Sequence, residues 1–135
     1  KVSKMFTFRT RIEFVKYKKE SSSDNGFMIF QDVQFHPMGM KWSCNVRYAI
    51  FDSDSYDARM YAYENDVLYG YSIPAYYYKG SRVYFNLRYK IAKGLDAWFR
   101  YAATFYSNRN VIGSGMDEIQ GNTKSEFKVQ LRVEF

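Results

Sequence analysis

The sequence predicts an all-β fold, an antiparallel up-and-down transmembrane β-barrel of about eight strands. Apolar and polar residues alternate along much of the chain, and its 135 residues combine 47% hydrophobic with 25% charged side chains. Such alternation places the two kinds of side chain on opposite faces of an extended strand. No run approaches the roughly 18 to 20 apolar residues of a membrane-spanning helix, which excludes a helical membrane protein. The alternating segments are close to the roughly 9 to 11 residues with which a tilted strand crosses a bilayer.

Eight strands are predicted from the segments that lie between turn signals. They lie, in order, near residues 3–18, 27–36, 42–51, 57–64, 67–78, 82–91, 95–106 and 124–135. The first strand alternates well around Phe6 and Phe8, and the third alternates from Trp42 to Ile50. The second, fourth and fifth alternate poorly, and Pro74 removes a backbone hydrogen-bond donor from the fifth.

The sixth and seventh strands are predicted to form a hairpin. Apolar residues recur at every second position from Val83 to Ile91 and again from Leu95 to Phe105. Between these segments Gly94 can adopt the positive φ angle that a tight turn requires. No linker or change of composition divides the chain, so residues 1–135 are expected to form a single barrel domain or a fragment of a larger barrel.

The eighth strand closes on a phenylalanine. Its apolar positions alternate with polar or charged ones and are Phe127, Val129, Leu131, Val133 and Phe135. A final amphipathic strand of this kind resembles the C-terminal signal by which the barrel-assembly machinery recognises bacterial outer-membrane proteins. The resemblance implies that these five residues form an assembly signal as well as part of the barrel wall.

The predicted connections alternate between a longer polar set and a shorter set. S-S-S-D-N-G, D-S-D-S-Y and the segment 107–123 belong to the longer set, and P-M-G-M-K, E-N-D and A-K-G belong to the shorter set. Outer-membrane barrels have long external loops and short periplasmic turns, and an even strand count places both termini on the short-turn side. The pattern therefore favours such a barrel, with K-G-S at residues 79–81 as an exception.

Packing volume favours an outward orientation of the large apolar side chains. The interior of an eight-stranded barrel is only wide enough for its own side chains, and a lining of many Phe, Tyr and Trp rings would overfill it. The opposite face then lines the lumen, with the charged residues Arg47, Arg88, Asp96, Arg100, Glu126, Lys128 and Arg132. Aromatic residues near strand ends are expected to form girdles at the lipid interfaces. They are Phe6, Tyr76, Tyr77, Tyr78, Tyr106 and Phe135.

No catalytic, metal or cofactor motif is recognisable. Cys44 and His36 are the only cysteine and histidine, so the sequence offers neither an internal disulfide nor a histidine metal cluster. G-S-G at residues 113–115 lacks the rest of a phosphate-binding motif, and Asp117 with Glu118 lacks EF-hand spacing. His36, at a predicted short turn, is expected to lie away from the serine of this long loop. A net charge of +6 does not indicate nucleic acid, because basic and acidic residues are mixed on the polar faces.

The second half of the chain resembles a known family. The segments Y-F-N-L-R-Y-K (84–90), W-F-R-Y-A-A-T-F-Y-S-N-R (98–109) and the stretch 112–135, which begins I-G-S-G-M-D-E-I-Q, are similar to the C-terminal barrel of a family of Bacteroidota outer-membrane proteins. Some members carry a helix-hairpin-helix region upstream. The resemblance implies the last part of a larger barrel, in contact with outer-membrane lipid, the assembly machinery and further strands or other outer-membrane subunits. It implies no catalytic residues.

The expected function is a non-catalytic structural or pore-forming component of the bacterial outer membrane, without a cofactor. A soluble lipocalin-like barrel that binds an apolar ligand is the alternative, because alternation alone does not say which face points inward. A third hypothesis is an outer-membrane enzyme, which a hydrolase or acyltransferase activity abolished by His36→Ala would support.

Overall fold

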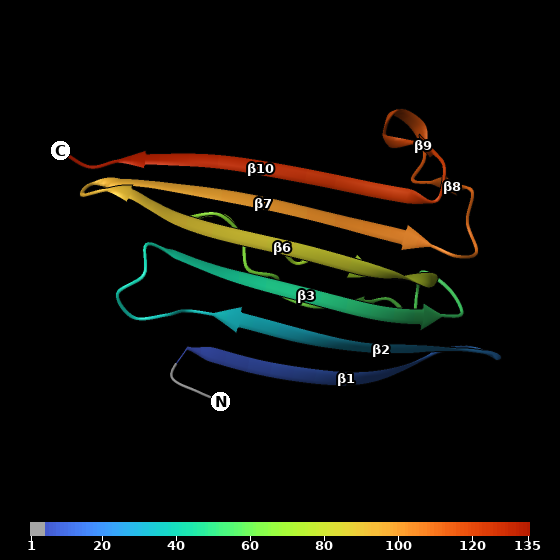
Figure 1. Cartoon of the computed structure of the whole chain (residues 1–135). Helices are drawn as coiled ribbons and strands as arrows, with labels where there is room; N and C mark the ends of the chain where they lie inside the picture. The colour runs from blue at the N-terminus through green and yellow to red at the C-terminus, as the bar shows by residue number, and fades with distance from the viewer. Residues whose placement is uncertain (1–4) are drawn as a thin grey trace.

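The computed structural model describes residues 5–135 and contains one large antiparallel sheet with two small sheets (Figure 1). The large sheet consists of β1 (Phe6–Lys19), β2 (Ser22–Phe35), β3 (Trp42–Ser53), β6 (Lys79–Ala92), β7 (Leu95–Tyr106) and β10 (Thr123–Val133). These strands follow one another across the sheet in this order, and each is antiparallel to its neighbour. The predicted all-β, antiparallel architecture is therefore confirmed.

Six of the eight predicted strands occur, with ends displaced by a few residues, and two are wrong. Residues 3 and 4 of the first predicted strand lie outside the described residues. Residues 57–64 and 67–78 belong to the connection 54–78 between β3 and β6, which contains only the two-residue strands β4 (Met60–Tyr61) and β5 (Ala75–Tyr76). Poor alternation and Pro74 explain this outcome, because neither segment can present one apolar and one polar face as a wall strand.

The large sheet is open. β1 forms one edge and β10 forms the other, and among residues 5–135 no pairing joins these two strands. The closed eight-stranded barrel is therefore wrong for the described residues, because the connection 54–78 does not supply two strands to the wall. Six long strands remain, with two edges that no described strand covers.

Connections at the two ends of the sheet differ in length. The segments 36–41 and 93–94 lie at the end where β1 begins and β10 finishes, which we call the short-turn end (Figure 1). The connections 54–78 and 107–122 lie at the opposite, long-loop end, together with the two-residue turn 20–21 between β1 and β2. Gly94 adopts a φ angle of 76°, as its predicted turn requires. Three predicted connections are wrong, because S-S-S-D-N-G lies almost entirely inside β2, K-G-S lies inside β6 and E-N-D lies inside the connection 54–78.

The connection 107–122 has a small fold of its own. In it β8 (Val111–Ile112) pairs with β9 (Ile119–Gln120), and the 3-10 helix η1 (Gly115–Asp117) lies between them. No helix in the described part of the chain has the length and apolar character needed to cross a membrane.

The core lies between the sheet and the connection 54–78. We call the face that this connection covers the inner face, and the opposite face the outer face. Buried apolar residues of the core come from the sheet and from both long connections: Met28, Phe30, Ala49, Phe51, Met60, Ala62, Tyr76, Tyr106 and Ile112. Gly26 permits a close approach of the connection to β2, because a Cβ atom there would lie 2.5 Å from the Ala58 carbonyl oxygen.

Candidate functional site

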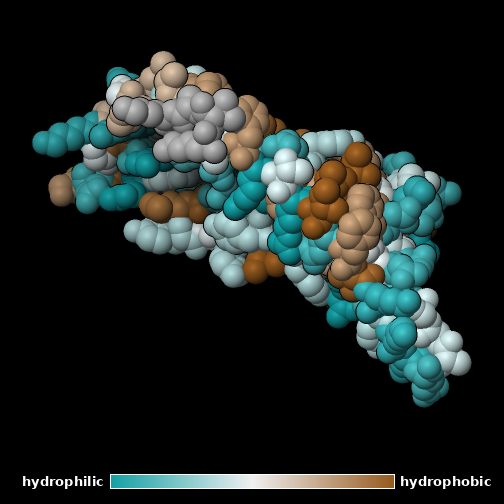
Figure 2. Space-filling view, turned by 90° about the horizontal axis from the view of Figure 1, so that it is seen from below, coloured by the Kyte–Doolittle hydropathy of each residue, from teal (hydrophilic) through white to brown (hydrophobic). Residues whose placement is uncertain are grey.

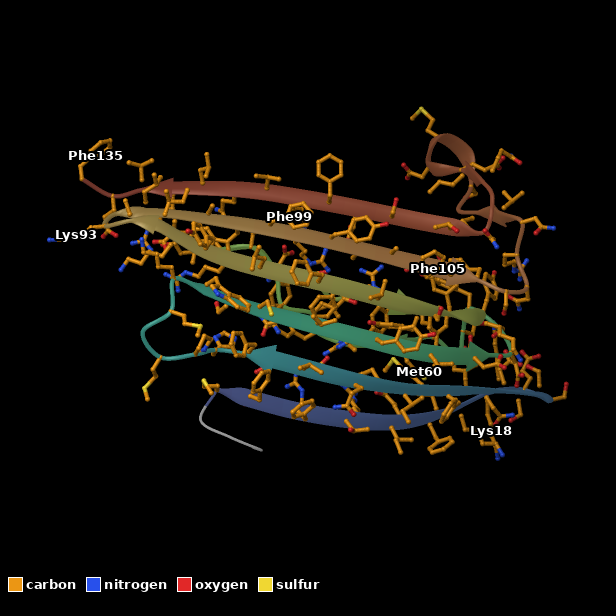
Figure 3. All side chains as sticks on the ribbon, in the orientation of Figure 1. Lys18, Met60, Lys93, Phe99, Phe105 and Phe135 are labelled. Atoms are coloured by element: carbon orange, nitrogen blue, oxygen red, sulfur yellow. The ribbon has the colours of Figure 1, made fainter. Side chains whose placement is uncertain are left out.

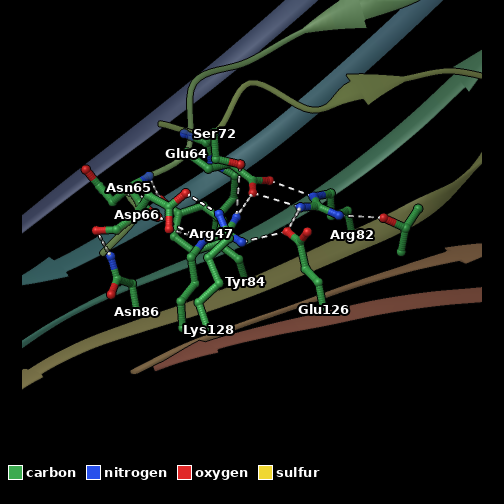
Figure 4. A network of polar contacts seen from close by, with 12 residues as sticks. Arg47, Glu64, Asn65, Asp66, Ser72, Arg82, Tyr84, Asn86, Glu126 and Lys128 are labelled. Carbon is green, nitrogen blue, oxygen red and sulfur yellow. Dashed lines mark hydrogen bonds and ion pairs between the residues drawn. The ribbon is translucent and has the colours of Figure 1, made fainter. Parts of the chain in front are cut away.

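A buried carboxylate, Glu64, holds the connection 54–78 against the inner face (Figure 4). It is 0% exposed and accepts hydrogen bonds from Arg82 of β6, at 2.7 and 2.9 Å, and from Arg100 of β7. The Tyr76 hydroxyl donates a further bond of 2.8 Å. Burial, followed by the Glu64 carboxylate, raises the pKa of Tyr76, so the phenol keeps its proton and remains a donor. Two arginines and one tyrosine therefore satisfy one carboxylate.

Two further residues of the same connection, Asn65 and Asp66, contact the sheet beside Glu64. The Asp66 carboxylate accepts a 2.6 Å bond from the Lys128 ammonium of β10, and its backbone carbonyl accepts a 2.7 Å bond from the Asn86 amide of β6. The backbone carbonyl of Asn65 accepts a 3.2 Å bond from Arg100. The three consecutive residues E-N-D therefore join the connection to β6, β7 and β10.

Glu126 of β10 completes this network. Its carboxylate accepts a bond of 2.6 Å from Arg100 and one of 3.3 Å from Arg82. Three cations thus face three carboxylates, and the cluster as a whole is neutral. We call it the Glu64 network, and its members are Glu64, Asp66, Arg82, Arg100, Glu126 and Lys128.

A second ion cluster lies on the other half of the inner face. Asp32 of β2, which is 1% exposed, accepts bonds of 2.5 and 2.9 Å from Arg47 of β3. Arg9 of β1 donates two more, at 2.9 and 2.7 Å. The Arg47 guanidinium also lies over the Phe30 ring, 3.7 Å from its centroid. Hydrogen bonds and ring stacking therefore accommodate this buried charge.

Both clusters are suited to fixing elements in place. The Asp32 and Glu64 carboxylates each accept several hydrogen bonds from arginines, so each joins neighbouring elements through one buried group. Residues 5–135 contain no group of three or more His, Cys, Asp or Glu side chains that could hold a metal ion. The arrangement can hold the connection 54–78 on the sheet and fill the space on its inner side.

The outer face carries the large apolar side chains. Phe127 and Val129 of β10 are 74% and 65% exposed, and Phe99 and Phe105 of β7 are also exposed there (Figure 3). Figure 2, a view onto the β1 edge, shows hydrophobic side chains gathered in patches among hydrophilic ones. The register places exposed apolar side chains side by side on neighbouring strands, as at Val129 and Phe99, and large exposed apolar patches often mark contact sites.

Aromatic contacts border the outer face at two levels. At the short-turn end the Phe35 ring lies 4.7 Å from both the Phe6 and the Trp42 ring, measured between centroids. Nearer the long-loop end, Phe14 lies 5.2 Å from Phe27. Phe14 follows Phe6 by eight residues, which is about 26 Å of strand and about 20 Å across a bilayer at a tilt of about 40°. This height approaches the apolar band of roughly 25 Å in transmembrane barrels, whose borders carry aromatic girdles.

The four tyrosines predicted for the girdles lie elsewhere. Tyr76 and Tyr106 are buried in the core, and Tyr77 and Tyr78 end the connection 54–78. Of the predicted girdle residues, Phe6 belongs to the aromatic row at the short-turn end. The reason is that residues 76–78 do not lie in a wall strand, and Tyr106 lies on the inner face opposite Gly80.

All seven charged residues predicted to face a lumen lie on the inner face. The register places Arg47, Arg88, Asp96, Arg100, Glu126, Lys128 and Arg132 on the same side of the sheet. Arg100, Glu126 and Lys128 come together in the Glu64 network, and Arg47 joins the Asp32 cluster. Arg88 donates a 3.1 Å bond to Asp96 near the short-turn end. Arg132 pairs with Glu134.

The residues predicted as an assembly signal lie along one edge of the sheet. Phe127, Val129, Leu131 and Val133 alternate on the outer face of β10 and are all exposed, and Phe135 follows the strand. They form a ridge of apolar side chains next to the unpaired edge of β10.

The loop residues considered for chemistry are not assembled into a site. His36 lies in the connection between β2 and β3, where its Nε2 atom is 3.2 Å from the Asn45 side-chain oxygen. Ser114 lies in the connection 107–122, at the opposite end of the sheet (Figure 1). The Glu118 carboxylate accepts a 2.5 Å bond from Gln120 within the same loop.

Asp32, Glu64 and Asp66 are central to the inner face, yet the alternation pattern does not single them out. Glu64 and Asp66 were expected in a short turn, and Asp32 lies in a weakly alternating segment. One signal was available. Arginines outnumber carboxylates on the predicted polar faces of β3, β6 and β7, so acidic residues from another segment are needed to neutralise them.

No protein-family model, curated protein or solved structure matches this chain. The two faces of the sheet and the Glu64 network are therefore the observations from which a function is inferred.

Proposed function

We propose that the chain forms part of the wall of a bacterial outer-membrane β-barrel and acts there as a non-catalytic structural or pore-forming component. The observation that carries the proposal is the distribution of side chains between the two faces. On the inner face five charged residues of the sheet are buried and paired, namely Asp32, Arg47, Arg82, Asp96 and Arg100, whereas Phe, Tyr, Val, Leu and Ile side chains are exposed on the outer face. Exposure of so much apolar surface to water is unfavourable, and contact with lipid removes that penalty.

Strand length supports the same proposal. The six strands of the large sheet have 11 to 14 residues, which is enough for each to cross the hydrocarbon layer, since a tilted strand needs roughly 9 to 11. The connection 54–78 is compatible with this location. Irregular backbone is tolerated at membrane depth only where protein or a water-filled cavity surrounds it, and this connection lies on the charged inner face.

The two edges that no described strand covers indicate that the proposed wall requires further strands. Lipid cannot satisfy the backbone N–H and C=O groups of an open edge, so a transmembrane sheet must close. We therefore propose that further strands, from the same protein or from other outer-membrane subunits, pair with β1 and β10. The resemblance of residues 84–135 to the barrel of a Bacteroidota family supports this proposal. It adds outer-membrane lipid and the barrel-assembly machinery as partners, with Phe127, Val129, Leu131, Val133 and Phe135 as the recognition signal.

The two tryptophans provide a direct test, because they lie on opposite faces. Trp42 belongs to the aromatic row of the outer face, whereas Trp98 is 6% exposed and lies on the inner face. Trp98→Phe leaves only Trp42 as a fluorescent indole, and Trp42→Phe leaves only Trp98. We expect phospholipids with brominated acyl chains to quench Trp42 strongly and Trp98 weakly when each variant is reconstituted in vesicles.

Solubility separates this proposal from the lipocalin-like alternative. We expect the purified chain to require detergent or lipid to remain monodisperse. A chain that is monodisperse in plain buffer, with Trp42 insensitive to brominated lipid, would contradict a membrane location. Equal quenching of both tryptophans would show that the assignment of the two faces is wrong.

A further inference from the structure

A cavity of about 350 Å³ opens at the long-loop end, between the two long connections. Its lining comes from the connection 54–78, the end of β7 and the connection 107–122: Tyr56, Tyr77, Tyr78, Tyr106, Arg109, Val111, Ile112, Gly113 and Ser114. Pockets that bind small molecules have volumes of roughly 300 to 1,000 Å³ and combine aromatic walls with a few polar groups. The cavity is at the lower end of this range, and it contains no part of the Glu64 network.

Arg109 differs from the buried arginines of the inner face. Its guanidinium lies over the Tyr78 ring, 3.7 Å from the centroid. No carboxylate forms an ion pair with Arg109 within residues 5–135, whereas Arg47, Arg82 and Arg100 all have acidic partners. Stacking fixes the plane of a guanidinium and leaves its edge N–H groups available to a carboxylate or phosphate. Arg109 is therefore a positioned cation without a counter-ion.

Aromatic rings form the adjoining wall. The Tyr77 ring lies 5.0 Å from the Tyr56 ring and 5.7 Å from the Tyr106 ring, measured between centroids. Tyr106 is buried, whereas Tyr56 lies at the exposed rim. Clustered rings next to Ile112 offer flat apolar surface to a ligand, and tyrosines do so with little loss of side-chain entropy.

Backbone geometry at Tyr78 also indicates a specialised site. Tyr78 has a φ angle of 61°, which is unfavourable for a bulky residue that is not glycine. Ser53 holds this conformation from both sides. Its hydroxyl accepts a 2.8 Å bond from the Tyr78 backbone N–H, and its own backbone N–H donates a 2.9 Å bond to the Tyr78 carbonyl. Unfavourable backbone conformations of this kind cluster at ligand sites, where they position a particular side chain. Here the conformation positions the ring that carries Arg109.

We infer that this cavity binds a small carboxylate that has one flat apolar face. The carboxylate pairs with the edge of the Arg109 guanidinium, and the apolar face lies against the tyrosine rings. Acidic sugars and aromatic carboxylates share this chemistry, because the C–H face of a sugar and the face of an aromatic ring both pack on tyrosine. The inference does not depend on the membrane proposal, since both connections that form the cavity are present in the chain itself.

Binding can be measured with paired acidic and neutral probes. Glucuronate and 4-hydroxybenzoate are titrated into the purified chain, with glucose and 4-hydroxybenzyl alcohol as their neutral counterparts, and binding is followed by saturation-transfer NMR and calorimetry. We expect at least one acid to bind and its neutral counterpart to bind at least about tenfold more weakly. The acid that binds more tightly identifies the source of the ligand as a sugar or an aromatic compound.

Variants locate the site. Arg109→Gln is expected to weaken binding of the acid at least about tenfold, and Tyr56→Leu should weaken binding of the acid and of its neutral counterpart alike. Lys93→Gln is the matched control, because it removes one positive charge from the exposed turn at the short-turn end (Figure 3). Thermal unfolding of each variant verifies that it is folded.

Three results would overturn the inference. One is that neither acid binds the unmodified chain at about 10 mM. Another is that Arg109→Gln binds the acid as tightly as the unmodified chain does. The third is that Lys93→Gln weakens binding as much as Arg109→Gln, because the attraction would then depend on overall charge. None of these results bears on the quenching of Trp42 by lipid, so the two proposals can fail separately.

Discussion

Glu64 shows how much of this structure depends on single side chains. Its carboxylate has no contact with water, and it is stable there because Arg82, Arg100 and Tyr76 donate to it. The dependence is mutual. Without the Glu64 charge, Arg82 and Arg100 would share Glu126, whose side chain is partly exposed, and Arg100 would keep a longer ion pair of 3.8 Å with Asp66. A buried cation that loses its partner is far more costly than a lost hydrogen bond between neutral groups.

Glu64→Gln should therefore lower the free energy of unfolding by about 3 to 5 kcal/mol, because it leaves two buried guanidinium groups short of negative charge. Tyr76→Phe is the control. It removes the phenol bond to the same carboxylate, and should lower the free energy of unfolding by only about 1 kcal/mol. Denaturant titration followed by circular dichroism measures both values. If the two substitutions have equal effects, the ion pairs do not hold the connection in place.

At the scale of elements, the connection 54–78 packs on the inner face of the sheet and is joined to it mainly by side-chain contacts. It contributes acidic groups and the sheet contributes basic ones, so their docking combines charge neutralisation with the burial of Met60 and Tyr76. Within residues 5–135, one ion pair joins the connection directly to β10, the 2.6 Å pair between Asp66 and Lys128. Asp66 is buried at this contact, and the Lys128 side chain is 40% exposed.

A double-mutant cycle measures that attachment. Asp66→Asn and Lys128→Gln should show a coupling free energy of about 1 kcal/mol, because solvent near Lys128 weakens an ion pair that would be stronger if fully buried. Lys124→Gln, on the same face of β10, is the matched control, and no ion pair joins Lys124 to Asp66 in residues 5–135. Its cycle with Asp66→Asn should be additive within about 0.5 kcal/mol. Equal coupling in both cycles would refute a specific contact.

The alternation of apolar and polar residues predicts some elements of the fold well and others not at all. β6, β7 and β10 follow from a strict period of two, which depends only on neighbouring residues. The connection 54–78 could not be predicted in this way, because its path is determined by contacts with distant residues. Glu64 lies where it does because Arg82 and Arg100 are there, and no local pattern in 57–64 encodes those partners. The inner-face position of Arg100, Glu126 and Lys128 was predictable, whereas their assembly around one carboxylate was not.

At the scale of the whole molecule, the two faces of the sheet are the inverse of those in a soluble barrel. The inner face carries the buried ion pairs together with the apolar core under the connection 54–78, and the outer face carries exposed apolar side chains. Closure could not be predicted from the sequence. The number of strands in a wall depends on whether weak segments such as 67–78 join the sheet, and pairing between edges is a long-range property.

Substitutions at neighbouring positions of β10 test the assignment of the faces. Val129 points outward and Gln130 lies on the inner face opposite Trp98. In lipid vesicles, Val129→Arg should lower the free energy of unfolding by about 2 to 4 kcal/mol if Val129 lies near the middle of the bilayer, and Gln130→Arg should have a much smaller effect. Reversible unfolding in urea, followed by tryptophan fluorescence, gives both values. A larger effect at Gln130 would mean that the charged face, and not the apolar one, meets the lipid.

The Glu64 network also constrains the order of events during folding. Glu64 precedes Arg82 by 18 residues and Arg100 by 36, and Asp66 precedes Lys128 by 62. The connection is therefore synthesised before every strand that will neutralise it, and its carboxylates must stay hydrated until those strands arrive. Contacts so distant along the chain form slowly, because long loops must close first. A connection that collapsed early onto β2 and β3 would bury Glu64 without its arginines. The Glu64 network is complete only once β10, the last of these strands to be synthesised, supplies Glu126 and Lys128.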